Sequence, residues 1–297
     1  MTVGIFWHPD IFLHDRHAKH CAMDSRRIET VAAAVLTLAG TKQELAGPVS
    51  PEQLFRVHDP DYLAMLASSA HLEDHESMTV APQSALNKHS WRAMELSAGA
   101  ACQAVDAVLA KRVKHAFNPV YAGHHAEFAG AGGFCFINTA LVAAMHAQAR
   151  GAKRIAVLDF DTHSGNGTIM GLLAHPEMLF AETYQQGYPG PFLKHTTRPG
   201  HILREQCRRR EDFIKAWSQF FTTLSAWQPD IMIVSAGFDA HKNDPLSEVN
   251  LDDADYEWLA KGLRSIGAPV VASLEGGYSV PDVARCAALF VATLARA

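Results

Sequence analysis

Short apolar runs alternate with longer amphipathic segments along almost the whole chain. The short runs are typical of buried strands, because nearly all of their residues are apolar. They predict strands over residues 3–7, 114–117, 154–159, 177–181, 231–235 and 269–274. The amphipathic segments predict helices over residues 24–38, 59–68, 85–110, 138–149, 209–225, 254–265 and 281–294. This alternation favours an α/β fold in three layers (α/β/α), with a mostly parallel central sheet.

The composition indicates a globular chain with a sizeable core, because 48% of its 297 residues are hydrophobic and 19% are charged. We find no repeat, low-complexity tract or linker, and therefore expect a single domain over residues 1–297. The five cysteines are scattered and form no Cys-x-x-Cys pair, which argues against a disulfide framework or a cysteine-based zinc site.

Charge and hydropathy limit the partners. The net charge of −5 comes without a basic patch, which argues against a nucleic-acid partner. The first 20 residues lack the pattern of a signal peptide. No apolar run reaches the roughly 20 residues that a membrane span needs. We therefore expect a cytoplasmic protein without a membrane partner, and the sequence leaves its oligomeric state open, a homo-oligomer included.

Polar residues follow four of the predicted strands at the ends where ligands bind in parallel sheets. The most informative stretch is 158–168, Leu-Asp-Phe-Asp-Thr-His-Ser-Gly-Asn-Gly-Thr, which ends an apolar run. If the chain stays extended there, Asp159, Asp161 and His163 share one face. Unpaired buried carboxylates are costly, so we expect a cation beside them.

Asp161, His163 and Asp239 are the candidate metal ligands. Three protein ligands with open positions are the catalytic arrangement of zinc, although oxygen and nitrogen donors also suit Fe²⁺ or Co²⁺. Alone, an Asp-x-His sequence is more typical of a turn or a cap than of a metal site.

His124 and His125 lie together in a glycine-rich segment and can supply a proton acceptor and a proton donor. Asp159 is a natural partner for one ring and Asn166 for the other. A carboxylate raises the pKa of its histidine far more than an amide does, so the two rings can be tuned differently. Tyr278, after two glycines, can stabilise an oxyanion with its phenol. In isolation these residues read as surface histidines and a buried tyrosine.

Together these residues resemble the zinc-dependent histone deacetylase and acetylpolyamine amidohydrolase family, whose fold is the arginase–deacetylase fold. The shared motifs run through nearly the whole chain in family order. They are Val57-His-Asp-Pro-Asp-Tyr62, Gly123-His-His-Ala126, Gly133-Phe-Cys-Phe-Ile-Asn138, Asp159-Phe-Asp-Thr-His163 with Gly165-Asn-Gly-Thr168, Ser235-Ala-Gly-Phe-Asp239 with Asp244-Pro-Leu246, and Glu275-Gly-Gly-Tyr278. Asn166, where other members carry Asp, resembles the class II branch and its bacterial relatives.

The resemblance implies a role for each matching position. Asp161, His163 and Asp239 would bind one Zn²⁺. His125, partnered by Asn166, would be the general base and acid. His124, held by Asp159, would be the electrostatic or second proton-transfer histidine. Tyr278 would polarise the scissile carbonyl. The resemblance also implies a substrate channel walled by Gly133, Phe134 and Tyr188 with Leu246 at its rim, and a K⁺ ion beside Asp159, Asp161 and His163.

Several positions depart from the family pattern. Ser164 replaces a histidine that is not a ligand, so the expected metal site survives. Glu182-Thr183 replaces a serine-containing pair at the K⁺ site. The segments 118–123 and 16–27 also differ, which leaves substrate preference open. His8, His14, His17 and His20 favour a solvated or substrate-facing loop over a second metal site.

The expected reaction is zinc-dependent hydrolysis of an N-acyl amide, with acetyl as the favoured acyl group, on a lysine side chain, a polyamine or a similar aliphatic amine. One alternative is a two-manganese ureohydrolase of the same fold, which needs a carboxylate where Gly165 stands. The other is a catalytically silent module that binds acylated amines. The proton-transfer residues argue against that module, because a binder does not need them.

Overall fold

The computed structural model describes residues 2–14, 26–187 and 201–296. Within these ranges eight strands form one sheet in the order β2-β1-β5-β10-β9-β6-β7-β8, and all neighbouring strands are parallel. The strands are β1 (Val3–Trp7), β2 (Thr41–Leu45), β5 (His115–Asn118), β6 (Ile155–Asp159), β7 (Leu179–Tyr184), β8 (Ile202–Gln206), β9 (Ile231–Ala236) and β10 (Val270–Leu274). The predicted α/β fold with a mostly parallel sheet is therefore confirmed.

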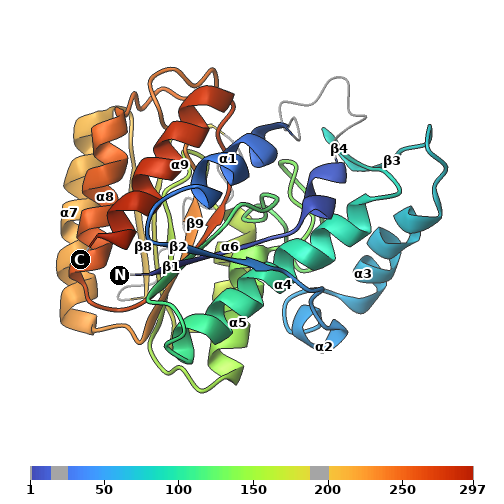
Figure 1. Cartoon of the computed structure of the whole chain (residues 1–297), viewed down its shortest axis with the longest axis horizontal. Helices are drawn as coiled ribbons and strands as arrows, with labels where there is room; N and C mark the ends of the chain where they lie inside the picture. The colour runs from blue at the N-terminus through green and yellow to red at the C-terminus, as the bar shows by residue number, and fades with distance from the viewer. Residues whose placement is uncertain (1, 15–25, 188–200, 297) are drawn as a thin grey trace.

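Helices cover both faces of the sheet (Figure 1). One layer contains α7, α8 and α9 with α1, and the other contains α4 and α5 with α6. The α-helices are α1 (Arg26–Leu36), α2 (Pro51–Leu54), α3 (Pro60–Ala67), α4 (Ser90–Leu109), α5 (Thr139–Ala149), α6 (Asn166–Leu172), α7 (Arg210–Trp227), α8 (Asp253–Ser265) and α9 (Val280–Ala295). Short 3-10 helices span Pro9–Leu13 and Ser68–His71.

The central strands are apolar because both of their faces are covered. Every residue of β6, β9 and β10 is buried. The edge strand β2, by contrast, reads Thr-Lys-Gln-Glu-Leu and is largely exposed. Burial of apolar surface on both faces of the sheet is the main favourable contribution to folding.

The structure departs from the predicted elements where strands are polar. The apolar pattern does not predict β2 and β8, because edge strands that are partly exposed need no apolar run. Nor does it predict the antiparallel pair β3 (Met78–Ala81) and β4 (Ser84–Leu86). The helix predicted over 85–110 therefore begins at Ser90, and β4 occupies the start of that range.

The sheet order brings the predicted site residues together. β5, β10, β9 and β6 are consecutive neighbours, and each precedes one of the polar loops singled out in the sequence. All four strands point the same way, so their carboxyl ends meet at one edge of the sheet.

His58 holds the loop that follows β5 through hydrogen bonds to its backbone. Its Nδ1 lies 2.9 Å from the Glu127 carbonyl oxygen, and the Asn138 N–H donates to its Nε2 over 2.9 Å. Nδ1 therefore carries the proton, and the ring must stay neutral to keep both bonds. Burial lowers the pKa of His58 to about 4, despite the carbonyls at Nδ1.

We predict that His58 makes the folded protein sensitive to acid. The unfolded chain takes up this proton near pH 6.5 and the folded chain only near pH 4, so the free energy of unfolding should fall as the pH falls through this window. The contribution is at most about 3 kcal/mol. Urea unfolding of the protein and of His58→Gln at pH 7 and pH 4.5 measures it. The variant should lose less stability between the two pH values, and equal losses would contradict the prediction.

Candidate active site

Buried acidic and imidazole side chains converge at the carboxyl ends of the four strands. His124 and His125 follow β5, Asp159 ends β6, and Asp239 follows β9. The side chains of Asp159 and Asp239 are almost completely buried. Such burial is tolerated only where each charge has a hydrogen-bonding or cationic partner.

Asp161, His163 and Asp239 form a compact cluster, with one ligand atom from each within 4.8 Å of the others. His163 Nδ1 lies 3.1 Å from Asp161 Oδ1 and 2.9 Å from Asp239 Oδ2. The second oxygen of each carboxylate accepts a backbone N–H, Gly276 N at 2.7 Å for Asp161 and Thr162 N at 2.8 Å for Asp239. The other carboxylate oxygens, Asp161 Oδ1 and Asp239 Oδ2, therefore both face the His163 ring.

This donor set fits a metal ion. Zinc–ligand bonds of about 2.0–2.2 Å place neighbouring ligand atoms roughly 3–3.5 Å apart, close to the spacing found here. Burial and the charge of Asp161 raise the pKa of Asp239 to about 7. Burial lowers the pKa of His163, but the two carboxylates outweigh it and raise that pKa to about 10. The cluster therefore attracts positive charge.

Gly276 has no side chain and therefore leaves room for the carboxylates of Asp161 and Asp239. A Cβ atom there would lie 2.5 Å from Asp161 Oδ2 and 2.5 Å from Asp239 Oδ2. Its backbone N–H also donates to Asp161, so the residue must be both close and without a side chain. This explains a glycine in the Glu275-Gly-Gly-Tyr278 motif in physical terms.

Asp159 does not join this cluster. The strand β6 ends at Asp159 and the chain then bends, so the extended conformation expected between Asp159 and His163 is not found. Asp159 Oδ2 instead lies 2.9 Å from His124 Nδ1, and its Oδ1 accepts from the Asp161 N–H. The carboxylate of Asp159 thus serves a histidine.

The two adjacent histidines have different partners. His124 faces Asp159, whereas His125 Nδ1 lies 2.7 Å from Asn166 Oδ1. The two ring centroids are 4.1 Å apart. Burial lowers the pKa of His124, but the charges of Asp159, Asp161 and Glu275 outweigh it and hold that pKa well above the usual value.

The pKa of His125 lies well below its usual value, because burial and the neighbouring charge of His124 disfavour the imidazolium. The pair is therefore tuned in the sense expected from a carboxylate on one ring and an amide on the other. His124 is therefore suited to carry a positive charge, and His125 is suited to accept a proton.

Glu275 and Asn138 hold the histidine loop. The sequence alone predicts no role for either residue. Glu275 Oε2 accepts from Gly123 N at 2.7 Å and His124 N at 3.2 Å, while its Oε1 accepts from Ser235 Oγ. Asn138 Nδ2 donates to the Ala126 carbonyl oxygen over 3.2 Å. Both residues lie in the quoted motifs, but only the fold shows what they contact.

Asp244 joins the Tyr278 loop to the Leu246 loop. Its Oδ2 accepts from Tyr278 N at 2.6 Å and its Oδ1 from Leu246 N at 3.0 Å. Burial and the charges of Asp239 and Asp161 raise the pKa of the Tyr278 phenol well above its usual value, so the hydroxyl keeps its proton. Leu246 is 42% exposed, as a residue at a rim would be.

The predicted channel residues are only partly placed. Gly133 (φ 51°) packs against His125, since a Cβ there would lie 2.3 Å from His125 Cδ2. Phe134 (φ 67°) is partly buried beside it. Tyr188 lies outside the described residues, as do His17 and His20 of the segment that departs from the family pattern.

A buried ion pair lies beside the metal-ligand loop. Glu182 Oε1 is 2.6 Å from Arg204 Nε, and Ser164 Oγ and Gly165 N donate to the same carboxylate. Arg204 Nη2 also donates to Ser164 Oγ over 2.9 Å, and its guanidinium lies 4.6 Å from the centre of the Tyr184 ring. The Glu182 carboxylate therefore already has a cationic partner, the guanidinium of Arg204.

We predict that Arg204→Met strongly destabilises the fold, because it leaves the Glu182 charge buried without its cation. The loss should be about 3–5 kcal/mol. Urea unfolding checks this value, and the double variant Arg204→Met/Glu182→Gln should regain much of it. A loss below about 1 kcal/mol, typical of surface pairs, would contradict the prediction.

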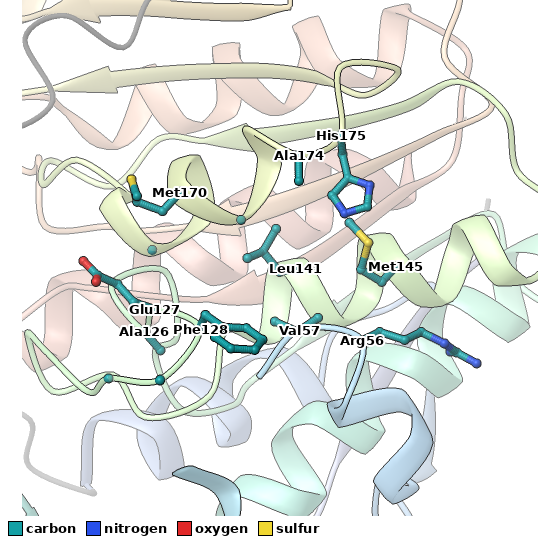
Figure 2. A pocket seen from close by; sticks show the side chains of 14 residues that line it. Arg56, Val57, Ala126, Glu127, Phe128, Leu141, Met145, Met170, Ala174 and His175 are labelled. Carbon is teal, nitrogen blue, oxygen red and sulfur yellow. The ribbon is translucent and has the colours of Figure 1, made fainter. Parts of the chain in front are cut away.

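A separate pocket of about 530 Å³ lies between α5, α6 and the segment that follows the histidine pair (Figure 2). Leu141, Met145 and Met170 form much of its wall, with Phe128 and Glu127 from the loop. None of its lining residues is among the predicted site residues. It is therefore distinct from the Asp161–His163–Asp239 cluster.

A parallel α/β sheet that carries a histidine pair beside an Asp–His–Asp cluster defines a deacetylase-like protein. The chain belongs to the histone deacetylase family, since the family described as the histone deacetylase domain matches residues 21–294. In the described ranges no helix is long and apolar enough to cross a membrane.

Relatives and solved structures agree with this family. The chain is 30% identical over 266 residues to the polyamine deacetylase HDAC10 of Mus musculus, which covers 82% of this chain and 40% of the relative. Acetylpolyamine amidohydrolase 1 of Pseudomonas aeruginosa is 32% identical over 173 residues, 54% of this chain and 50% of the relative. The chain thus spans about half or less of the length of these relatives.

Two solved structures share the fold. The HDA15 HD domain superposes with a TM-score of 0.92 at 26% identity, covering 99% of this chain and 90% of that one. The acetylpolyamine aminohydrolase from Burkholderia pseudomallei gives a TM-score of 0.88 at 23% identity, covering 99% and 98%. The two relatives above are named as a polyamine deacetylase and an acetylpolyamine amidohydrolase.

Proposed function

We propose that this chain is a zinc-dependent amidohydrolase that removes an acetyl group from the amine of a lysine side chain, a polyamine or a similar aliphatic amine. The products would be acetate and the free amine. The observation that carries the proposal is the histidine pair beside the Asp161–His163–Asp239 cluster. One ring of the pair meets a carboxylate and the other meets an amide.

In this proposal a bound zinc ion supplies Lewis acidity for the acyl carbonyl and for a water molecule. His125, with its depressed pKa, takes the proton of the attacking water. His124 stays cationic against Asp159 and stabilises the developing negative charge. The Tyr278 hydroxyl donates to the oxyanion, and a histidine returns a proton to the leaving amine.

The two-manganese ureohydrolase is disfavoured by the same contacts. Gly165 offers no carboxylate, and Asp159 is engaged with His124. His241, which stands where such an enzyme would continue its second metal-binding run, pairs with Asp253 at 3.0 Å. A silent binding module is disfavoured because it needs no pair of differently tuned histidines.

The chemistry of the rim supports an aliphatic substrate. Leu246 is exposed, and Phe134 is partly buried beside His125. We propose that these side chains contact the alkyl stem of the substrate, with Gly133 and Tyr188 as further channel residues. Acetate release is measured with acetyl-lysine peptides, acetylputrescine and acetylspermidine, with a chelator control. The result decides whether the substrate is an acetylated lysine of a protein or an acetylated polyamine.

Other features stay predictions. A K⁺ ion beside Asp159, Asp161 and His163 would have to rely on groups other than Glu182, whose carboxylate already meets Arg204. Fe²⁺ or Co²⁺ remain alternative metals for the same donors. A single catalytic domain over residues 1–297, a cytoplasmic location and the lack of nucleic-acid and membrane partners also stay predictions, and a homo-oligomer stays one of the options for the assembly.

We predict that Asp239→Asn loses zinc and activity together. The amide keeps an oxygen for the Thr162 N–H but removes the charge that the ion needs. Zinc per chain is measured after dialysis, and acetate release is followed in parallel. Asp61→Asn, at an exposed position, is the matched control. A variant that retains one zinc per chain would refute the ligand assignment.

We predict that Tyr278→Phe lowers kcat by about 10²–10³, by analogy with the loss of one oxyanion-hole donor. Zinc content should not change, because the phenol is not among the ligands. Steady-state kinetics on the best substrate from the panel above provide the measurement. Unchanged turnover on every accepted substrate would remove Tyr278 from the mechanism.

A further inference from the structure

Glu127 lies on the loop two residues after His125 and reaches back toward the site. Its Oε1 accepts from Asn166 Nδ2 over 2.8 Å, and the oxygen of the same amide lies 2.7 Å from His125 Nδ1. The residue itself is exposed on the wall of the 530 Å³ pocket, and Figure 2 shows its side chain beside α6, which begins with Asn166.

The backbone of Glu127 is fixed on both sides. Its N–H donates to the Gly130 carbonyl oxygen over 2.9 Å, and its own carbonyl oxygen faces His58 Nδ1. The loop therefore presents the side chain from a defined position. A freely moving surface glutamate would lack these two restraints.

The chemistry of the three groups sets one direction for the whole chain of hydrogen bonds. A carboxylate only accepts, so the amide nitrogen of Asn166 must face Glu127 and its oxygen must face His125. That oxygen only accepts as well, so His125 Nδ1 must carry the ring proton. The lone pair is then on Nε2, the nitrogen from which His125 can act as a base.

We propose that Glu127 is a positioning residue that fixes the tautomer of His125 through Asn166. His124 needs no such relay, because Asp159 accepts from it directly. The relay also explains the amide at position 166. A carboxylate there would face the Glu127 carboxylate at hydrogen-bond distance, whereas asparagine supplies a donor on one side and an acceptor on the other.

The proposal rests on the proposed function for the role of His125, but the hydrogen-bond chain can be tested separately. The first test is a double-mutant cycle on acetate release. Asn166→Asp alone should lower kcat at least tenfold, because two carboxylates then oppose each other. Glu127→Gln together with Asn166→Asp should recover most of that loss, since the new amide nitrogen at position 127 donates to the new carboxylate at position 166.

Single variants at position 127 complete the cycle. Glu127→Ala should lower kcat by about fivefold or more with KM little changed, because the Asn166 amide can then reverse. Glu127→Gln should lose less, since its amide oxygen can still accept from Asn166. Glu73→Gln, a change at another exposed glutamate, is the control. If Asn166→Asp loses the same factor with and without Glu127→Gln, the proposal is overturned.

The second test does not depend on turnover. Nitrogen-15 NMR of labelled histidine in the zinc-loaded protein reports which ring nitrogen of His125 is protonated. The Nδ1–H form should dominate in the wild type and mix with the other tautomer in Glu127→Ala. Identical His125 signals in the two proteins would overturn the proposal. If these signals change as expected in a protein that hydrolyses no amide, the relay stands and the proposed function fails.

Discussion

The structure depends on how it accommodates negative charge near the carboxyl ends of its buried strands. Three of the carboxylates have partners of their own. Glu275 accepts backbone N–H groups, Glu182 meets Arg204, and Asp159 meets His124. Asp161 and Asp239 share one imidazole and three backbone N–H groups. Two carboxylates therefore face a single imidazole, which carries at most one positive charge, so a divalent cation is the natural complement of this cluster.

The same constraint separates the two histidines. His124 lies against a carboxylate and is stabilised as a cation, which in turn disfavours a second cation on His125. The amide of Asn166 can orient His125 without adding a full charge to it. In our account Glu127 then determines which way this amide points. A proton acceptor and a fixed positive charge thus arise side by side from one carboxylate and one amide.

Much of the fold follows from the apolar pattern, because the central strands are covered on both faces and must be apolar. The polar edge strands β2 and β8 escape this pattern, since exposure removes the requirement. The β3–β4 hairpin was also hidden, because a short irregular pair resembles the start of the helix that follows it.

The site was predictable where a residue type limits the chemistry, as with Asp161, His163 and Asp239. Which histidine meets Asp159 depends on the path of the loop, and the residues alone left this open. Contacts between distant segments were less accessible still. The bond from Glu127 to Asn166 joins positions 39 residues apart, and the ion pair of Glu182 joins two neighbouring strands that the sequence did not both reveal.

The central claim is that this cluster holds a single ion. Anomalous diffraction from crystals of the metal-loaded protein, recorded above and below the zinc absorption edge, tests it most directly. We expect one peak bounded by Asp161, His163 and Asp239, with no second peak beside it. Two neighbouring peaks, as in a two-metal ureohydrolase, or no peak between these three residues would contradict it.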